Sequence, residues 1–455
     1  MKKVLISSSI ILILGLLSCK KEAATPALQE EVATAKPSAP PPPPSILQWQ
    51  KTYGGSSAEL GYAITQDESG NYLFAASALT NSGDVSEHHG GVGADAWVVK
   101  TNASGLINWS HCFGGTKGDY AYDIIAASDG SGYVFAGVTA SSDGNLLGQL
   151  SRGGRDIWVA KLDPSTGTIL WQKTYGGSAD DWANSIIETS DGGFLVVGTT
   201  ASTDGDITQM RGAGDVWIIK LASNGDMMWQ KTYGGSLSDG VSSITALGNE
   251  FILCASSESA DGDLSTLTNH GGGDTWVFRI DLSGNLLWGK TYGGTGGEGS
   301  GTIYPVDGGY VFSTTTSSNN GDVSGNHGYV DTWIVKIDAN GNKIWQKCFG
   351  GFDMDNARIR DVDALGNIVI VGYTFSKNGD IPNTNRGEEL WVLRLDAEGN
   401  KLSSNILGGR GGDMARTAIP TADGMYMTIG RSNSNDGDVT GNHGGEDVWM
   451  VKFKF

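Results

Sequence analysis

The strongest constraint on the fold of this chain is a short motif that recurs along almost its whole length. Residues 171–177 show it in full as Trp-Gln-Lys-Thr-Tyr-Gly-Gly. Its glycine pairs recur every 57 to 62 residues, at Gly54-Gly55, Gly114-Gly115, Gly176-Gly177, Gly234-Gly235, Gly293-Gly294, Gly350-Gly351 and Gly408-Gly409. A fixed period of this length indicates seven copies of one structural unit, which decides the architecture to which every other residue belongs.

The third repeat shows what each unit contains. Residues 183–189 and 194–200 are two strand-like segments joined by an Asp-Gly-Gly turn, which predicts a β-hairpin. A longer polar loop then leads to a third predicted strand at 215–221, and a turn containing Gly225 leads to a fourth at 227–233. Four short antiparallel strands, repeated seven times, predict an all-β, seven-bladed β-propeller, with a solenoid as the alternative.

The two ends of the repeat array favour a ring over a solenoid. The last repeat ends after its third strand at 447–452, whereas residues 46–53 form a strand of the fourth type with no blade before it. We therefore expect the N-terminal strand to complete the last blade, because a solenoid would need distinct capping repeats. Thirteen of the 14 tryptophans occupy repeat positions and are expected to pack between strands, and Trp182 is the exception.

The repeat motifs also carry a resemblance to a known family. The patterns W-x-K-x-Y-G-G, D-G-G-Y and D-x-W-x-x-K-L-D, over residues 47–452, resemble the short β-propeller repeats of bacterial secreted and surface lipoproteins. The resemblance implies the propeller fold. It implies no single activity, because such repeats occur in proteins with unlike functions.

The N-terminus predicts export and lipidation. Lys2 and Lys3 precede an apolar run at 4–17, so residues 1–18 are interpreted as a secretory signal peptide rather than a membrane span. The run ends like a bacterial lipobox, which would make Cys19 the lipidated first residue of the mature protein. Residues 19–45 are a Pro- and Ala-rich linker, and residues 46–455 are expected to form the propeller.

The net charge and the cysteine content limit which partners and metals the protein is expected to bind. The net charge of −19 argues against nucleic acid, which needs a basic surface. We expect a monomer attached to the bacterial outer membrane by its lipid, facing either the periplasm or the cell exterior, with a protein or glycan ligand. Beyond Cys19 the cysteines are Cys112, Cys254 and Cys348, which show neither a disulfide framework nor zinc spacing.

An acidic residue follows the second glycine of every pair by four positions. We predict that these seven carboxylates stand at the mouth of the central channel and face a ligand. The alternative is that they accept backbone hydrogen bonds within the turns. The residues are Glu59, Asp119, Asp181, Asp239, Glu298, Asp355 and Asp413.

The Asp-Gly-Asp turns and the histidines of the long loops are candidate metal ligands. Hard oxygen ligands on glycine-rich turns suit Ca²⁺, although the spacing is not that of an EF-hand, and the alternative is again local hydrogen bonding. No other cofactor is predicted, and zinc is disfavoured because the histidines are spread around the ring. The calcium candidates are Asp204, Asp206, Asp261, Asp263, Asp436 and Asp438.

Departures from repeat symmetry are the best indication of a specific site. Directly after the acid, two neighbouring blades carry Tyr120 and Trp182, beside Asp119, Asp180 and Asp181. Aromatic faces flanked by carboxylates suit a sugar or a cationic side chain. Packing at the rim of the ring is the alternative.

The function predicted from these observations is a membrane-anchored binding or scaffold module. One alternative is a carbohydrate-active enzyme, such as an endoglucanase-type glycoside hydrolase or a lyase, and another is a structural member of an envelope complex. Seven equivalent acids do not form the differentiated carboxylate pair that glycoside hydrolysis needs, and no nucleophile or phosphate-binding motif is present.

Overall fold

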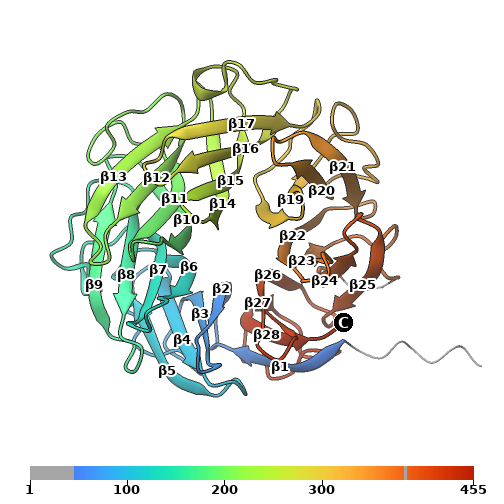
Figure 1. The fold of residues 1–455 in the computed structure, drawn as a ribbon. Coiled ribbons are helices and arrows are strands. Elements are labelled where there is room, and N and C mark those ends of the chain that lie inside the picture. The colour runs from blue at the N-terminus through green and yellow to red at the C-terminus, as the bar shows by residue number, and fades with distance from the viewer. Residues whose placement is uncertain (1–45, 384–386) are drawn as a thin grey trace, which may run out of the picture. The chain divides into compact units, whose positions relative to one another are not determined.

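The computed structural model describes residues 46–383 and 387–455. In this part of the chain, 28 strands form seven separate four-stranded sheets whose neighbouring strands are antiparallel. The sheets follow one another around a central opening (Figure 1). The predicted seven-bladed β-propeller is therefore confirmed. The predicted signal peptide, the lipidated Cys19 and the linker lie outside the described residues.

Each blade has one strand beside the central opening and three farther out. The innermost strands are β2 (Leu60–Gln66), β6 (Asp119–Ala126), β10 (Asp181–Glu188), β14 (Asp239–Leu247), β18 (Thr302–Val306), β22 (Asp355–Val362) and β26 (Asp413–Pro420). The second strands are β3 (Tyr72–Ala78), β7 (Tyr133–Thr139), β11 (Phe194–Thr200), β15 (Glu250–Ser257), β19 (Gly309–Thr316), β23 (Ile368–Thr374) and β27 (Tyr426–Ser432).

The third strands carry the buried tryptophans, and the fourth strands form the outer edge. The third strands are β4 (Asp95–Thr101), β8 (Asp156–Leu162), β12 (Asp215–Leu221), β16 (Asp274–Asp281), β20 (Asp331–Asp338), β24 (Glu389–Leu395) and β28 (Asp447–Phe453). The fourth strands are β5 (Ile107–Phe113), β9 (Ile169–Tyr175), β13 (Met227–Tyr233), β17 (Leu286–Tyr292), β21 (Lys343–Phe349), β25 (Lys401–Leu407) and β1 (Leu47–Tyr53). Two short 3₁₀ turns, η1 (Gly144–Leu146) and η2 (Gly262–Leu264), lie in loops. No helix in the described part of the chain is long and apolar enough to cross a membrane.

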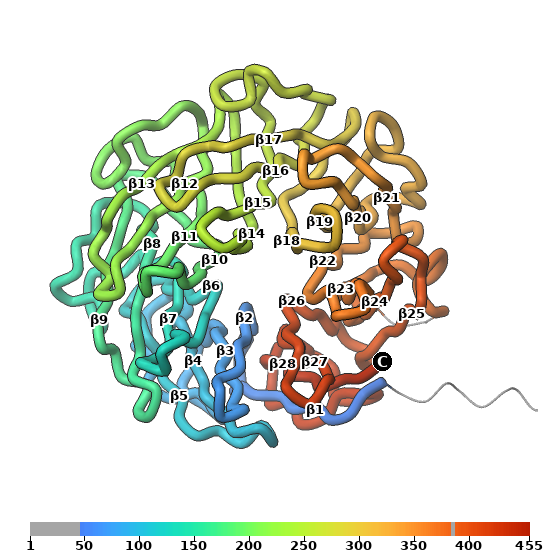
Figure 2. Tube along the Cα trace, viewed as in Figure 1, coloured from blue at the N-terminus to red at the C-terminus, as the bar shows by residue number. Residues whose placement is uncertain are grey.

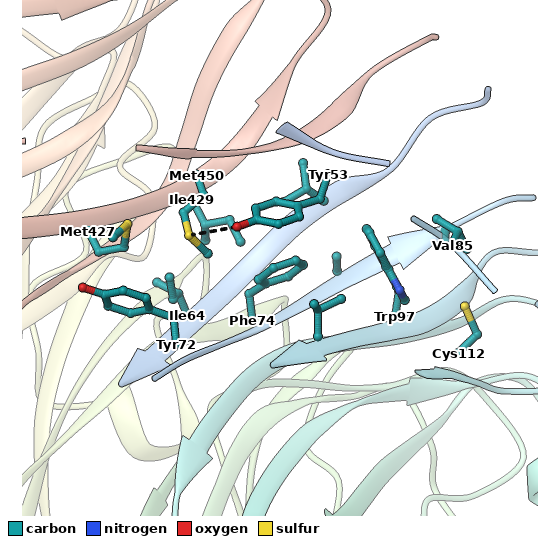
Figure 3. Packing of buried hydrophobic residues seen from close by; sticks show 14 residues of the cluster. Tyr53, Ile64, Tyr72, Phe74, Val85, Trp97, Cys112, Met427, Ile429 and Met450 are labelled. Carbon is teal, nitrogen blue, oxygen red and sulfur yellow. Dashed lines mark hydrogen bonds between the residues drawn. The ribbon is translucent and has the colours of Figure 1, made fainter. Parts of the chain in front are cut away.

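The ring closes as the repeat pattern predicts. Strand β1 pairs antiparallel with β28, so the seventh sheet has the order β1-β28-β27-β26 and joins the two ends of the described chain. Figure 3 shows the contact behind this closure, where Tyr53 lies against Phe74 of blade one and Met450 of blade seven. The hydroxyl of Tyr53 donates a hydrogen bond to the carbonyl oxygen of Gly105 at 2.7 Å.

The hydrophobic core lies between the blades rather than within them. Seven clusters of buried side chains each combine residues of two neighbouring sheets, one cluster for each junction of the ring. The third-strand tryptophans are among the largest fully buried side chains and fill these junctions. Burying large aromatic rings at every junction makes each blade depend on its neighbours.

The innermost strands border the central opening (Figure 2), and most of them contain a β-bulge. Six of the seven pair with the second strand through a one-residue register shift, for example between Ala121 and Asp123 and between Ala183 and Ser185. A β-bulge of this kind bends the strand and turns one extra side chain. In this ring the bulges turn side chains toward the central cavity.

Candidate functional site: the central channel

The seven acids predicted at the channel mouth are buried instead, with at most 4% of each residue exposed. In every blade, a carboxylate oxygen accepts a hydrogen bond of 2.6–2.8 Å from the N–H of the second glycine of the pair. Buried turn N–H groups need such acceptors, so the carboxylates turn inward. The channel-mouth prediction is wrong for Glu59, Asp119, Asp181, Asp239, Glu298, Asp355 and Asp413, and none of them lines the central cavity.

A second buried acid stands at the start of each third strand. In four blades, this acid meets a loop histidine whose Nδ1 lies 2.7–3.0 Å from the carboxylate. The pairs are His89 with Asp95, His270 with Asp274, His327 with Asp331, and His443 with Asp447. These histidines therefore hold the loops onto the blades.

The calcium candidates also bind backbone groups. In blade three, Asp204 accepts a hydrogen bond from the N–H of Ser178, and Asp206 accepts one from the N–H of Gly176. The other two turns repeat this arrangement, with Asp261 and Asp263 in one and Asp436 and Asp438 in the other. Within residues 46–383 and 387–455, no group of three or more His, Cys, Asp or Glu side chains could hold a metal ion. Calcium binding stays a prediction.

The aromatic pair singled out by the sequence lies on one side of the ring, and a third ring joins it. Tyr122 stacks on Tyr120, with ring centroids 5.7 Å apart, and on Trp182, with centroids 6.3 Å apart. Their acidic neighbours do not face a ligand, because Asp119 and Asp181 are buried. Asp180 forms an ion pair of 3.5 Å with Arg155, whose guanidinium lies over the Trp182 ring at 4.7 Å. Of the three predicted flanking carboxylates, only Asp180 is therefore partly exposed, and it is paired with Arg155.

The described ring encloses a central cavity of about 690 Å³. Residues of the innermost strands of all seven blades line it, and Trp182 contributes to its wall. The lining mixes aromatic, amide, hydroxyl and guanidinium groups. A cavity of this size with converging polar groups matches the usual form of small-molecule sites.

One repeat position supplies much of this wall. It lies seven residues after the second glycine of each pair, and six of its seven residues line the cavity. Its residues are Tyr62, Tyr122, Asn184, Ser242, Gly301, Arg358 and Arg416. The residues predicted from the sequence, Tyr120 and Trp182, lie two positions earlier in the repeat, and the sequence prediction did not include this layer. A comparison of the repeats could have found it, because this chemically variable position directly follows one that is small in most blades.

The cavity carries positive charge in an acidic protein. Its charged lining residues are Arg358 and Arg360 on β22, Arg416 on β26, and Asp123 on β6. Burial and the nearby Arg358 lower the pKa of Arg360 to about 10, and burial, together with Arg416, lowers the pKa of Arg358. Both guanidinium groups remain charged at neutral pH.

The single carboxylate in this wall is firmly held. Asp123 accepts hydrogen bonds of 2.9 Å from the N–H groups of Ile124 and Ile186 and from the hydroxyl of Ser185. Burial raises the pKa of Asp123 even so. Among the described residues, no ion pair within 4.0 Å joins Asp123 to any of the three arginines. The carboxylate is thus part of the wall and does not neutralise the arginines by contact.

Comparisons of the sequence identify no family. No protein-family model matches the chain. Among curated proteins, the regulatory protein FlaEY of Caulobacter vibrioides is 24% identical over 171 residues. This match covers 35% of the present chain and 18% of that protein, so it spans less than a fifth of the relative's length.

Several solved structures have a similar arrangement, all with low sequence identity. The β-propeller domain of the Trilobed protease from Pyrococcus furiosus is 10% identical, with a TM-score of 0.44 over 87% of this chain and 94% of that one. Chaetomium thermophilum Sqt1, solved with the N-terminus of the ribosomal protein L10, is 11% identical, with a TM-score of 0.44 over 90% and 100%. The periplasmic gluconolactonase PpgL of Pseudomonas aeruginosa is 13% identical, with a TM-score of 0.44 over 78% and 87%. Similarities of this size carry no assignment of function.

Proposed function

We propose that this protein is a lipid-anchored, extracytoplasmic binding module whose ligand occupies the central cavity. The observation that carries the proposal is the cavity wall, where one repeat position carries aromatic, amide, hydroxyl and guanidinium side chains in different blades. A purely structural ring would not need this chemical variety at one repeat position. A binding site does, because a few placed polar groups among apolar faces orient a ligand.

Binding fits the cavity better than hydrolysis does. Glycoside hydrolysis by the usual route needs two carboxyl groups at a defined separation, one on either side of the bond to be cleaved. Among the described residues that line the cavity, Asp123 is the sole carboxylate, and three hydrogen bonds already hold it in place. We therefore favour a binding module over the carbohydrate-active enzyme.

Membership of the short-repeat lipoprotein family and attachment at Cys19 belong to the same proposal. The apolar run at 4–17, followed by Ser18-Cys19, supports them. We expect wild-type protein to sediment with the membranes of the producing bacterium, and Cys19→Ser to move to the soluble fraction, because the lipid would be its main hold on the membrane. Fractionation with an antibody to the propeller measures this. Equal membrane association of the two proteins would contradict the anchor.

The channel site can be tested by filling it. Ser242 lies on the bulge of β14 and lines the cavity, so Ser242→Trp would place a large ring inside. We expect full-length protein in detergent to bind members of an array of neutral and acidic oligosaccharides. We expect Ser242→Trp to weaken that binding about tenfold or more, because the ligand and the new ring would compete for the same volume.

Ser283→Trp is the matched control. Ser283 belongs to the same blade, is exposed in the turn between β16 and β17, and does not line the cavity. This variant should bind like wild type, and both variants should keep a wild-type melting temperature within a few degrees. A folded wild-type protein that binds nothing on the array, or a Ser242→Trp variant that binds normally, would overturn the proposed site. Chemical change of the bound sugar would favour the enzyme instead.

A further inference from the structure

The distribution of charge in the cavity is opposite to that of the whole protein. The chain has a net charge of −19, yet the cavity wall holds three arginines and one carboxylate. Arg358 and Arg360 stand two residues apart on β22, and Arg416 stands on the neighbouring strand β26. Like charges collected in a confined space destabilise a protein unless something else balances them.

The described protein supplies that balance only in part, through the attraction between Asp123 and Arg360. The Arg358 side chain makes no hydrogen bond or ion pair with any described residue, although it lines the cavity. Arg360 donates from Nη2 to the carbonyl oxygen of Arg416, while its buried Nε has no partner in the described structure. Arg416 lies over the ring of Tyr62 at 5.7 Å. Several guanidinium N–H groups therefore remain available to a ligand.

The part of the wall next to Arg416 is aromatic. Tyr62 meets Tyr122 edge to face, with ring centroids 5.1 Å apart, and Tyr122 stacks in turn between Tyr120 and Trp182. Such rings offer flat apolar faces that can pack against a ring-shaped ligand. Asn184 and Ser242 add amide and hydroxyl groups at the same level of the cavity.

Together, the arginines and the aromatic rings of the cavity wall indicate which class of ligand it binds. Guanidinium groups bind carboxylates in a charge-assisted, often bidentate geometry, and they do so better than other side chains. Aromatic faces with nearby amide and hydroxyl groups suit the apolar face and the hydroxyls of a sugar ring. On the basis of the proposed function above, we propose that the central cavity binds an acidic saccharide whose carboxylate contacts Arg358 and Arg416.

The proposed ligand is negatively charged, whereas the sequence predicted a sugar or a cationic group. The acids beside Tyr120 and Trp182 favoured a sugar or a cationic ligand, but two of these three acids, Asp119 and Asp181, are buried. A ligand in the cavity would instead contact Arg358, Arg360 and Arg416. The carboxylate of Asp123 lies on β6 and is occupied by its own three donors.

The test uses full-length protein in detergent and pairs of probes that differ only in charge. The probes are oligosaccharides containing galacturonic or glucuronic acid, each compared with its methyl ester, and calorimetry measures binding. We expect at least one acid to bind about tenfold or more tightly than its ester, since the ester cannot form a charge-assisted pair. Arg358→Gln should remove this preference, and Arg358→Lys should restore part of it.

Arg410→Gln is the matched control, because it removes the same charge from an exposed loop side chain outside the cavity. It should leave the preference for the acid unchanged. Arg358→Gln should not lower the melting temperature, because the side chain has no described partner to lose and leaves a like-charged cluster. A lowered melting temperature would indicate a structural role.

The outcomes separate this inference from the proposed function. If neutral sugars bind as well as acids, and Ser242→Trp blocks both while Arg358→Gln changes neither, the channel site stands and the anionic ligand is wrong. If acids bind but Ser242→Trp has no effect, the channel site itself is wrong. If none of the acids binds to folded protein, the acidic-saccharide proposal is overturned.

Discussion

Deletion of residues 46–53 should lower the melting temperature of the full-length protein by about 10 °C or more. This segment contains β1, the strand that completes the seventh blade by pairing with β28. Removing it would also remove the fully buried Tyr53 and its contact with Phe74 (Figure 3). The hydrogen bond from the Tyr53 hydroxyl to the carbonyl oxygen of Gly105 would be lost as well. Loss of one large buried aromatic costs about 3–5 kcal/mol, and loss of the strand adds to that cost.

The deletion should also promote aggregation. Without β1, the N–H and C=O groups of β28 that now pair with it would form an open sheet edge. Thermal melting followed by circular dichroism, with size-exclusion chromatography, measures both effects. Deletion of residues 37–44 removes the same length of chain from the Pro-rich segment and is the control, since it leaves the strand in place. A melting temperature within about 3 °C of wild type after deletion of 46–53 would contradict the role of β1 in closing the ring.

The protein should be more stable at pH 5 than at pH 8. Burial raises the pKa of nine carboxyl groups in the blade junctions, namely Glu59, Asp119, Asp156, Asp181, Asp215, Asp239, Asp331, Asp355 and Asp447. A carboxyl group with a raised pKa in the folded state contributes stability that is complete below its unfolded pKa, near 4. That contribution is lost as the pH rises through the folded pKa. The free energy of unfolding should therefore decrease from mildly acidic to neutral and alkaline pH.

Asp156 gives this prediction a specific test. Burial, and to a lesser extent the nearby Asp181, raise the pKa of Asp156 to about 6, even though its Oδ2 accepts a hydrogen bond from the N–H of Arg152. A Cβ atom on Gly176 would collide with both carboxylates, so the two acids flank the same glycine. Asp156→Asn keeps an acceptor for Arg152 and removes one charge of the pair.

We expect Asp156→Asn to raise the melting temperature at pH 8 by about 1–2 °C and to reduce the difference between pH 5 and pH 8. The size follows from a stabilisation on the order of 1–2 kcal/mol, which allows for screening by solvent near the loop. Asp163→Asn is the control, because Asp163 lies in a hairpin turn and backbone hydrogen bonds lower its pKa. A wild-type melting temperature that is equal or higher at pH 8 would show that these acids do not govern stability.

The repeat predicted the fold in detail because its signals are local. In blade three, the predicted strands at 194–200, 215–221 and 227–233 match β11, β12 and β13, since turn glycines and apolar segments mark each end. The first strand begins at Asp181 rather than residue 183, because the carboxylate of Asp181 binds the glycine turn as the strand starts. Ring closure followed from the unmatched strand at 46–53.

The candidate site was predicted less well, because its residues come from all seven blades and form one cavity only in the assembled ring. The sequence alone determined the number of blades, the order of their strands and the variable positions at Tyr120 and Trp182. Tertiary structure decided which charges a ligand can meet. The acids are buried in the blade junctions because the N–H groups of the glycine turns need hydrogen-bond acceptors there. Tyr122 and Arg416 face the cavity because each lies on a β-bulge. Neither effect is visible in one repeat, since the direction of a side chain depends on the partner strand and the neighbouring blade.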